Sequence, residues 1–479
     1  MSLKAEFVDI LARQKNVFLS GKTLDIDFRR SQIQKVADIM VNHRQDLIDA
    51  LCSDFKKPVL QIKTEINCIY SKAYQAINNL QKWAAGVSIP NDMVTFNAHL
   101  SNVPQPYGSV LIIAPWNFPI ITSLEPLIGA IAAGNTIVLK LSEQVPALSA
   151  KMKQLIETNL DNECFSVITE PYSGEQLTQL DFDYVFYTGS TEIGRKIYQT
   201  VSKKLIPVTL ELGGSCPCYV HFDADIDTAA KRIAHIKAYN AGQMCFTVNH
   251  VFVHKKVAQD FKDAIINAWK SFFNIVIPFF RQDMKQSPDL GRIISEPHTE
   301  RLQAIIEKYK HQIVFGGDTD VSDRYVQPTL ISCNDPNSEI IKHEIFGPIL
   351  PVCTVEDEHE AINIIEMHQK PLKIFLFSNS ATVIDRFLVK TRSGGLTINE
   401  GFLCAAPPDL PFGGVGESGM GRYHGIETFN TFSNYRAIYK EKYRVGLLDN
   451  LIYPPFTPRE EALIDTFESK QYSRSCNIL

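Results

Sequence analysis

The sequence has no long apolar run and no leader-like start. No stretch of about 18 consecutive apolar residues occurs, so a membrane-spanning helix is not expected. The first residues do not place an apolar segment behind basic ones, so a secretory signal is not expected. The ten cysteines are scattered without a C-x-x-C pair. That usage disfavours a disulfide framework and favours a reducing, cytoplasmic location.

Signatures of metal and nucleic-acid binding are also missing. The histidines form no H-E-x-x-H or comparable spacing, so we expect no metal. Lys and Arg total 48 against 53 Asp and Glu, without an extended basic block, which disfavours a nucleic-acid partner. The 479 residues, 45% hydrophobic and 21% charged, suffice for two or three globular domains. A small-molecule partner is expected instead.

Two amphipathic helical stretches open the chain. Apolar residues recur at three- and four-residue spacing from Phe28 to Phe55 and again from Ile62 to Trp83. Between Val87 and Tyr107, prolines interrupt short alternating runs, which predicts an extended ribbon or hairpin. We expect a linker or assembly element there.

Short apolar runs and helical stretches then alternate along most of the chain. From 108 to 212 the expected strands cover 109–113, 136–139, 165–169, 184–187 and 208–210, and the expected helices cover 123–133, 147–159 and 191–203. After Gly213 further strands are expected near 218–222, 251–253, 313–315, 350–354, 374–377 and 396–398. This alternation predicts an α/β protein with two doubly wound parallel-sheet domains.

Cys245 is the first candidate for chemistry. It lies in Asn-Ala-Gly-Gln-Met-Cys-Phe, a small-residue turn between a helical pattern and an apolar strand. A nucleophile needs open space and nearby backbone N–H groups, and Ala241 and Gly242 keep both clear of side chains. A buried structural thiol is the alternative, because free cysteines are often buried. A cysteine hydrolase would need a histidine, and only His343 is available as a candidate base.

Asn117 and Glu211 are candidates for the groups around such a thiol. Two prolines fix the backbone around Asn117, and a rigid amide donor is what an oxyanion hole requires. A turn asparagine is the alternative. Glu211 ends the last strand of the first domain, where it can act as a base for water or for the thiol. A helix cap or an ion-pair partner is the alternative.

Two other strand ends suggest nucleotide contacts. Gly189-Ser190-Thr191-x-x-Gly194 opens a helix whose N-terminus can face a pyrophosphate. It is not the G-x-G-x-x-G fingerprint, so a simple glycine turn is the alternative. Lys140 and Glu143 follow another strand, where a lysine can hold ribose hydroxyls and a carboxylate can repel a 2′-phosphate. Solvated loop residues are the alternative there.

Six short motifs together resemble the aldehyde dehydrogenase superfamily. In chain order they are Pro115-Trp116-Asn117-Phe118-Pro119, Gly189-Ser190-Thr191-x-x-Gly194, Glu211-Leu212-Gly213-Gly214, Asn240-Ala241-Gly242-Gln243-x-Cys245, Glu344-Ile345-Phe346-Gly347-Pro348 and Pro411-Phe412-Gly413-Gly414-Val415-Gly416. The early start, the run from Ser418 to Gly425 and Tyr453-Pro454-Pro455 are most similar to the class 3 branch. The resemblance covers nearly the whole chain.

The resemblance implies NAD(P)-dependent oxidation of aldehydes to carboxylic acids, with medium- to long-chain aliphatic or aromatic substrates. Cys245 would attack the aldehyde, Asn117 and the Cys245 N–H would stabilise the oxyanion, and Glu211 would activate the water that releases the acid from a thioester. NAD is the expected cofactor, with some NADP use, because Glu143 repels an extra phosphate. Coenzyme A-acylating or esterase-like use of the thioester, and a non-enzymatic binding role, are the alternatives.

The resemblance also implies which residues surround the ligands. Those expected at the cofactor are Trp116, Lys140, Glu143, Gly189, Ser190, Gly194, Leu212, Glu344 and Phe346, and those expected at the substrate are Phe118, His235, Tyr239 and Met244. Two positions depart from the family pattern. Met244 replaces the usual threonine or other small residue before the nucleophile, and Ser215 replaces the usual lysine after Glu-Leu-Gly-Gly.

The expected domains are an NAD(P)-binding domain over 1–86 and 108–211, a catalytic domain over 212–424, and a bridging or oligomerisation element over 87–107 and 425–479 in a homodimer. The last residues have the form C-a-a-X, which predicts geranylgeranylation of Cys476, with chance placement as the alternative. One lipid would give weak peripheral membrane association. Arg459 to Tyr472 is expected to form a short helix that docks over a groove.

Overall fold

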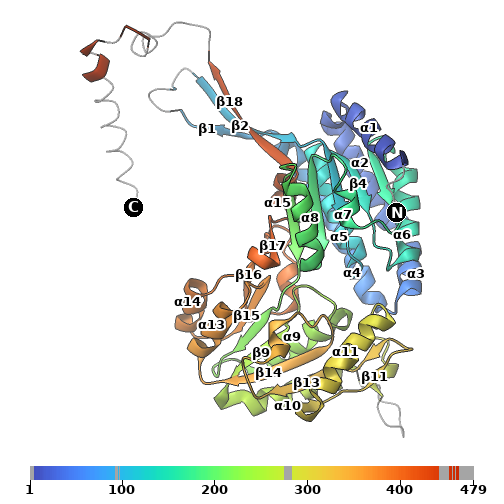
Figure 1. The fold of residues 1–479 in the computed structure, drawn as a ribbon, viewed down its shortest axis with the longest axis vertical. Coiled ribbons are helices and arrows are strands. Elements are labelled where there is room, and N and C mark those ends of the chain that lie inside the picture. The colour runs from blue at the N-terminus through green and yellow to red at the C-terminus, as the bar shows by residue number, and fades with distance from the viewer. Residues whose placement is uncertain are drawn as a thin grey trace. The chain divides into compact units, whose positions relative to one another are not determined.

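Figure 1 shows the fold in a computed structural model that describes residues 5–91, 95, 98–273, 283–441, 453–455, 457, 458 and 460–462. The chain divides into two compact units, which we describe separately. Unit 1 comprises Met1–Trp83 and Gln105–Asn434, and unit 2 comprises Ala84–Pro104 and Tyr435–Leu479. No helix among the described residues is long and apolar enough to cross a membrane.

Helices open unit 1. They are α1 (Ala5–Leu19), α2 (Ile26–Asn42), α3 (Arg44–Asp54) and α4 (Val59–Ala84), of which α4 runs on to the first residue of unit 2. The Asp25 side chain starts α2 by accepting hydrogen bonds from two N–H groups of its first turn. The periodic stretch from Phe28 to Phe55 is therefore two helices, because the backbone of His43 leaves the helical conformation.

The first sheet of unit 1 has six strands. They are β3 (Ser109–Ile113), β4 (Thr136–Lys140), β5 (Phe165–Ile168), β6 (Tyr184–Gly189), β7 (Val208–Leu212) and β17 (Gly419–Met420), in the order β17-β7-β6-β3-β4-β5. Neighbouring strands of this sheet are parallel except β17, which comes from late in the chain and pairs antiparallel with β7. The connecting helices include α5 (Pro119–Ala133), α6 (Pro146–Asn159), α7 (Gly174–Leu177) and α8 (Thr191–Ser202).

The second sheet has seven strands. They are β8 (Pro217–Val220), β9 (His250–His254), β10 (Ile313–Phe315), β13 (Thr329–Cys333), β14 (Ile349–Val355), β15 (Lys373–Phe377) and β16 (Gly395–Ile398), in the order β10-β13-β14-β9-β8-β15-β16. Two details differ from the prediction. The strand β13 was not expected, and β10 pairs antiparallel with it at the edge of the sheet.

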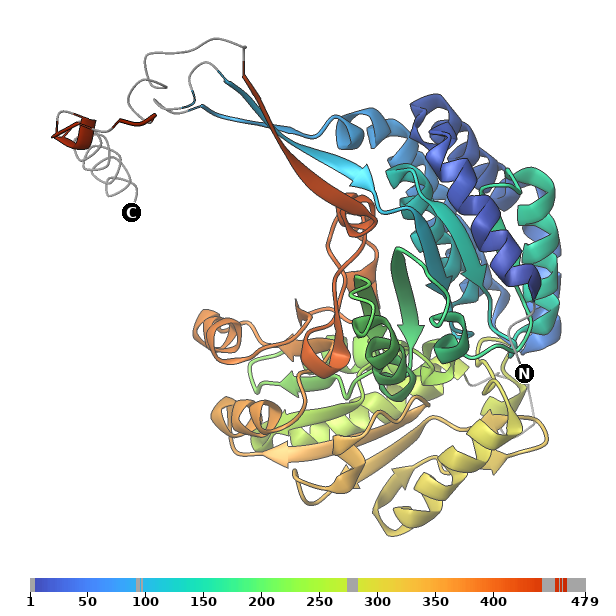
Figure 2. The same ribbon diagram turned by 45° about the horizontal axis from the view of Figure 1, so that its top comes forward.

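Helices cover both faces of the second sheet (Figure 2). Cys218 and Val220 pack with α9 (Ile226–Ala238) and α10 (Ala258–Phe273), while Tyr219 between them packs on the other face. That other face is covered by α11 (Glu296–Lys308), α13 (Glu358–Met367) and α14 (Ala381–Lys390). Strands buried on both faces need near-continuous apolar runs, and the strands were predicted from such runs. The two doubly wound α/β sheets are thus confirmed.

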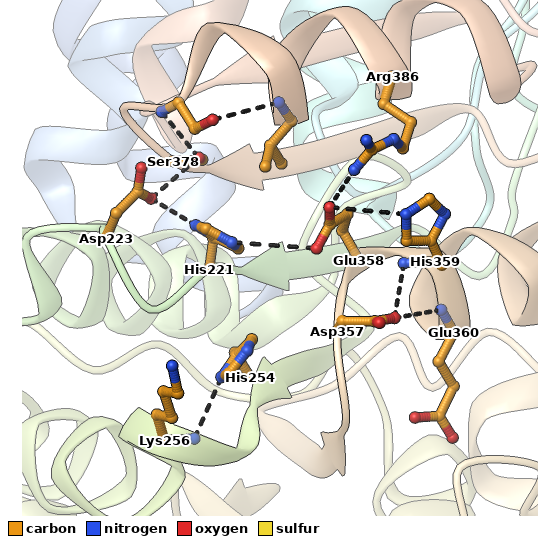
Figure 3. Close-up of polar contacts among 12 residues, drawn as sticks. His221, Asp223, His254, Lys256, Asp357, Glu358, His359, Glu360, Ser378 and Arg386 are labelled. Atoms are coloured by element: carbon orange, nitrogen blue, oxygen red, sulfur yellow. Dashed lines mark hydrogen bonds and ion pairs between the residues drawn. The ribbon is translucent and has the colours of Figure 1, made fainter.

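Polar residues close the carboxyl edge of the second sheet (Figure 3). His221, directly after β8, has its Nδ1 2.7 Å from Asp223 Oδ1, and the Ser378 hydroxyl, directly after β15, donates to the same oxygen over 2.9 Å. Glu358, at the start of α13, pairs with Arg386 and lies 4.0 Å from His221 Nε2. These groups satisfy one another at the strand ends.

Unit 2 contains a three-stranded sheet in the order β1-β2-β18, with β1 (Val87–Ile89), β2 (Ala98–Pro106) and β18 (Ser433–Glu441). Its strands β1 and β2 are antiparallel, as the hairpin predicted for 87–107 requires. The short elements β11 (Thr319–Asp320), β12 (Tyr325–Val326), α12 (Glu339–Lys342) and α15 (Ile426–Thr431) complete unit 1. Cys476 and most of the helix expected from Arg459 to Tyr472 lie outside the described residues.

Candidate active site

A cavity of about 690 Å³ lies within unit 1 and is lined by residues of the first sheet and by segments next to the strands of both sheets. Trp116 and Asn117 follow β3, Gly189 ends β6, and Glu211 belongs to β7, so the first sheet contributes its carboxyl edge. Cys245 precedes β9, so the second sheet contributes its amino edge. The sequence-predicted nucleophile, base and oxyanion donor thus line one cavity.

The turn that carries Cys245 is strained and tightly held. Asn240, Ala241 and Gly242 have φ values of 50°, 52° and 74°, in the left-handed region. A Cβ on Gly242 would clash with the backbone of Gly347, so only glycine fits there. The Gln243 side chain ties the turn down by donating to Asn240 O over 2.9 Å and accepting from Ile294 N over 2.9 Å. Such strain persists only where surrounding contacts enforce it.

Cys245 is half-buried and surrounded by acidic groups. Burial raises the pKa of its thiol, and the nearby Glu344, Cys216 and Glu211 raise it further, while its own backbone N–H lowers it. The thiol is therefore neutral near pH 7. Because the thiolate is the nucleophile, this site needs a proton acceptor.

Glu211 has the properties of that acceptor. Its side chain is 2% exposed, and neither carboxylate oxygen has a hydrogen-bond partner among the described residues. Burial, with a contribution from the Glu125 charge, raises the pKa of Glu211 well above its usual value. A carboxylate with a raised pKa can take a proton at neutral pH and release it again.

Asn117 is fixed through its backbone and keeps its amide only weakly engaged. Its carbonyl oxygen accepts from Lys57 Nζ over 3.1 Å and from Asn240 Nδ2 over 2.9 Å. Its Nδ2 makes one long bond of 3.3 Å to Gln243 O. A primary amide has two N–H donors, so one remains for an oxyanion.

The cation that holds Asn117 belongs to a buried ion pair that the sequence analysis missed. Lys57 Nζ lies 2.5 Å from Glu65 Oε1, and both side chains are almost completely buried. The second oxygen of Glu65 accepts from Ile120 N over 3.2 Å at the start of α5. The same ammonium lies 4.1 Å from the centroid of the Phe118 ring. The start of α4 therefore positions the whole Asn117 loop.

The cofactor side of the cavity fits a nicotinamide dinucleotide. Glu344 is half-buried, but its Oε1 is buried and unpartnered among the described residues, and removal of the carboxylate from water raises its pKa to about 7. Trp116 and Phe346 meet edge to face with ring centroids 5.6 Å apart, and Leu212 lines the same cavity. Ser190 also lines it and caps α8 by accepting from Ile193 N, so the N-terminus of that helix borders the cavity.

Three predicted cofactor residues do not line the cavity. Lys140 donates to Leu141 O over 2.6 Å and to Glu143 Oε2 over 2.9 Å, so this pair forms an ion pair just after β4. Gly194 acts in packing, because a Cβ there would lie 2.5 Å from the Leu212 side chain. Close approach of helix to strand is one reason for glycine in nucleotide-binding turns.

Aromatic side chains form the substrate wall. Phe118 stacks on Tyr239 with ring centroids 6.2 Å apart, and Tyr239 lies 4.1 Å from Phe402. Met244 borders the cavity but is fully buried in the core of the second sheet. His235 does not line the cavity and packs behind Tyr239. Medium- and long-chain aliphatic and aromatic aldehydes fit this lining.

The alternative base, His343, is on the surface. Its side chain is 82% exposed, and its Nε2 lies 3.7 Å from Glu339. It does not line the cavity. A hydrolase in which His343 activates Cys245 is therefore not supported by this geometry.

Comparison with known proteins agrees with these observations. The model of the "Aldehyde dehydrogenase family" matches residues 4–438. The human "Aldehyde dehydrogenase family 3 member B1" is 38% identical over 473 residues, which cover 98% of this chain and 99% of the relative.

Two solved structures extend the similarity to the fold. A substrate-bound Staphylococcus aureus AldH is 36% identical with a TM-score of 0.92, covering 98% of this chain and 100% of that one. An NADP complex of glyceraldehyde-3-phosphate dehydrogenase from Methanocaldococcus jannaschii is 25% identical with a TM-score of 0.83, covering 92% and 96%. The chain therefore belongs to the aldehyde dehydrogenase family and is an NAD(P)-dependent oxidoreductase that converts aldehydes to carboxylic acids.

Proposed function

We propose that the oxidation proceeds through a covalent thioester on Cys245. The observation that carries this proposal is the meeting of Cys245, Asn117 and Glu211, from three distant segments, on one cavity. The unpartnered oxygens of Glu211 support it further, because a buried carboxylate without partners is costly unless it has a task.

In the first step the Cys245 thiol gives its proton to Glu211 and the sulfur adds to the aldehyde carbon. The carbonyl π-bond breaks, and its electron pair moves to the oxygen. Asn117 Nδ2 and the Cys245 N–H stabilise this oxyanion, because both are held before the charge develops. The product is a thiohemiacetal.

Bound nicotinamide dinucleotide supplies the hydride acceptor that turns the thiohemiacetal into a thioester. Trp116, Glu344 and Phe346 would hold the nicotinamide end, with Ser190 near the pyrophosphate. Lys140 and Glu143 would hold the adenosine ribose. We propose NAD as the preferred cofactor with NADP also accepted, because Glu143 repels a 2′-phosphate while its ion pair with Lys140 weakens that repulsion.

The acid is released by hydrolysis. Glu211 first releases the proton of the thiol to solvent. It then takes a proton from water, the hydroxide oxygen adds to the thioester carbon, and the C–S bond breaks. The sulfur recovers a proton and the carboxylic acid leaves. Residues 1–86 and 108–211 would thus bind the cofactor, and 212–424 would provide the thiol.

For assembly we propose a homodimer. The strand β16 ends the seven-stranded sheet and β18 ends the sheet of unit 2, so each is an edge strand. Edge strands are templates for pairing with another chain. The segments 87–107 and 425–479 would carry this contact, and a sedimentation mass of two chains would support it.

A cytoplasmic location is also part of the proposal. Nine cysteines among the described residues are free thiols, as a reducing compartment requires. A prenyl group on Cys476 would add weak, reversible membrane association.

The test is an aldehyde panel with NAD or NADP, followed by nicotinamide absorbance and by analysis of the product. We expect reduction of the nucleotide and free carboxylic acid in equal amounts. Repetition with coenzyme A present tests the alternative, which predicts an acyl thioester in place of the acid. Formation of that thioester would overturn the hydrolytic step.

A further inference from the structure

A second buried ion pair lies on the cavity and has no place in the mechanism above. Lys72 on α4 and Glu125 on α5 both line the cavity, and Lys72 Nζ lies 2.5 Å from Glu125 Oε1. Their side chains are 9% and 3% exposed. His424 lines the same part of the cavity.

This pair differs from Lys57–Glu65 in how its carboxylate is satisfied. Both oxygens of Glu65 accept hydrogen bonds, whereas Glu125 Oε2 accepts none from the described residues. A buried ion pair stabilises a protein only when its remaining donors and acceptors are also satisfied. The open acceptor of Glu125 therefore resembles that of Glu211, which has a chemical task.

His424 does not donate a hydrogen bond to the unpartnered oxygen of Glu125. Its Nε2 lies 3.6 Å from Glu125 Oε2, beyond hydrogen-bond distance. Burial lowers the pKa of His424 to about 4, so the ring is neutral and has a single N–H. That ring already hydrogen-bonds the backbone of Leu410. Glu125 Oε2 is left as an acceptor that faces no donor.

The position of Glu125 on α5 separates it from the Asn117 end of that helix. Along α5, Ile121, Thr122 and Glu125 are three and four residues apart and line the cavity together. Glu125 lies six residues after Pro119, which begins the helix beside Asn117. At the rise of an α-helix this is about 9 Å. A substrate group that reaches Glu125 therefore lies about 9 Å along α5 from the end of the helix beside Asn117.

We propose that Lys72 and Glu125 form a subsite for a neutral hydroxyl group carried by the aldehyde, an inference that rests on the aldehyde oxidation proposed above. The hydroxyl donates to Glu125 Oε2 and accepts from Lys72 Nζ, which makes no other hydrogen bond among the described residues. A cationic group is repelled by Lys72 and a carboxylate by Glu125. A methyl group leaves the buried oxygen unpaired.

The test compares two series of aldehydes that match in chain length, one ending in a methyl group and one in a hydroxyl group. The measured quantity is the ratio of kcat/KM for the hydroxylated aldehyde to that for the plain aldehyde. We expect this ratio to peak at one chain length, where it exceeds the ratios at other lengths by about ten- to hundredfold, the effect of one hydrogen bond to a charged group.

The double variant Lys72→Met/Glu125→Met removes the subsite without leaving one buried charge alone. It should abolish the peak in the ratio, because loss of the Glu125 charge changes the pKa of Glu211 equally for plain and hydroxylated aldehydes. Glu125→Gln, which keeps the side-chain size, should lower the peak. The control is Lys153→Met/Glu157→Met, which removes a partly exposed ion pair on α6 and should leave the peak in place.

Two results would overturn the subsite while leaving aldehyde oxidation intact. One is a ratio in the wild-type enzyme that is flat over all chain lengths. The other is a peak that survives in Lys72→Met/Glu125→Met. Failure to oxidise any plain aldehyde would instead overturn the proposed chemistry, and the subsite with it.

Discussion

The carboxyl edges of the two sheets hold similar polar residues, but these residues differ in whether they have hydrogen-bond partners. At the first sheet, Glu211 faces the cavity with both oxygens unpartnered among the described residues. At the second, Asp223 accepts hydrogen bonds from His221 and Ser378, so these polar groups have partners in one another (Figure 3). Buried polar groups are normally paired, and each exception calls for an explanation. The difference indicates that the first edge acts in function and the second in structure.

The second sheet contributes to the active site through its amino edge. Cys245 precedes β9, and its turn is held in a left-handed conformation by Gln243. In open α/β sheets ligands bind at the carboxyl ends of strands, which applies to the first sheet alone. The second sheet positions one nucleophile at its amino edge. Variants at four places in the molecule can break or sharpen this contrast.

The largest effect is expected at the nucleophile. Cys245→Ala should lower kcat by at least about 10⁴-fold, because no other group can form the covalent bond. Steady-state turnover of an aldehyde with NAD measures it. The matched control is Cys218→Ala, a buried thiol on β8 that does not line the cavity, which should leave kcat within about twofold. Near-normal turnover by Cys245→Ala would place the chemistry elsewhere.

A smaller loss is expected at the oxyanion donor. Asn117→Ala should lower kcat by about 10²- to 10³-fold, the usual effect of removing one such donor. KM should change little, because the charge that Asn117 meets develops only after binding. An equally large loss of kcat/KM that comes from a raised KM, with kcat unchanged, would show that Asn117 binds the ground state of the substrate instead.

The positioning pair should have a weaker effect. Lys57→Met/Glu65→Met removes both charges of the buried pair and should lower kcat by about ten- to hundredfold, since Asn117 loses one of its two anchors. Lys57→Met alone should also destabilise the protein by about 3–5 kcal/mol, because Glu65 is left unpaired. Kinetics and thermal unfolding of both variants separate these effects. An unchanged kcat in a folded double variant would refute the positioning role.

The smallest effect on activity is expected at the second edge. Asp223→Ala leaves His221 and Ser378 without their shared acceptor, and should lower the free energy of unfolding by about 1–3 kcal/mol. The value of kcat/KM should stay within about twofold. Urea denaturation and steady-state kinetics check the two parts. A large loss of activity in a stable variant would mean that this edge is functional after all.

Apolar patterning predicted most of the fold. The five parallel strands of the first sheet were placed within two residues, because parallel strands buried on both faces need continuous apolar runs, whereas the short antiparallel strand β17 was not predicted. The strand β13 was not predicted because polar Thr329 and Ser332 interrupt its apolar run, and its identity depends on pairing with β14. The antiparallel direction of β10 likewise depends on how the chain connects the strands, and a local sequence pattern does not record those connections.

The residues of the site likewise divide into those that a local motif predicts and those that only distant contacts reveal. Cys245, Asn117 and Glu211 stand in short motifs, so they could be found without coordinates. Lys57 acts through contacts with residues about 60 positions away, which no local motif records. A signal did exist in α4, where the charged Glu65 and Lys72 fall on the buried face with Ile62, Ile66 and Ile69. Charges on an apolar stripe predict buried partners, without naming them.

The most direct test of the central claim is a single-turnover experiment with Glu211→Gln. Because Glu211 accepts the proton of the thiol and later that of water, this variant should form the thioester slowly, reduce at most about one nucleotide per active site and then nearly stop. Mass spectrometry of the digested enzyme should find the acyl group on the peptide that contains Cys245. Sustained turnover with free acid, or an acyl group on a different residue, would contradict the account.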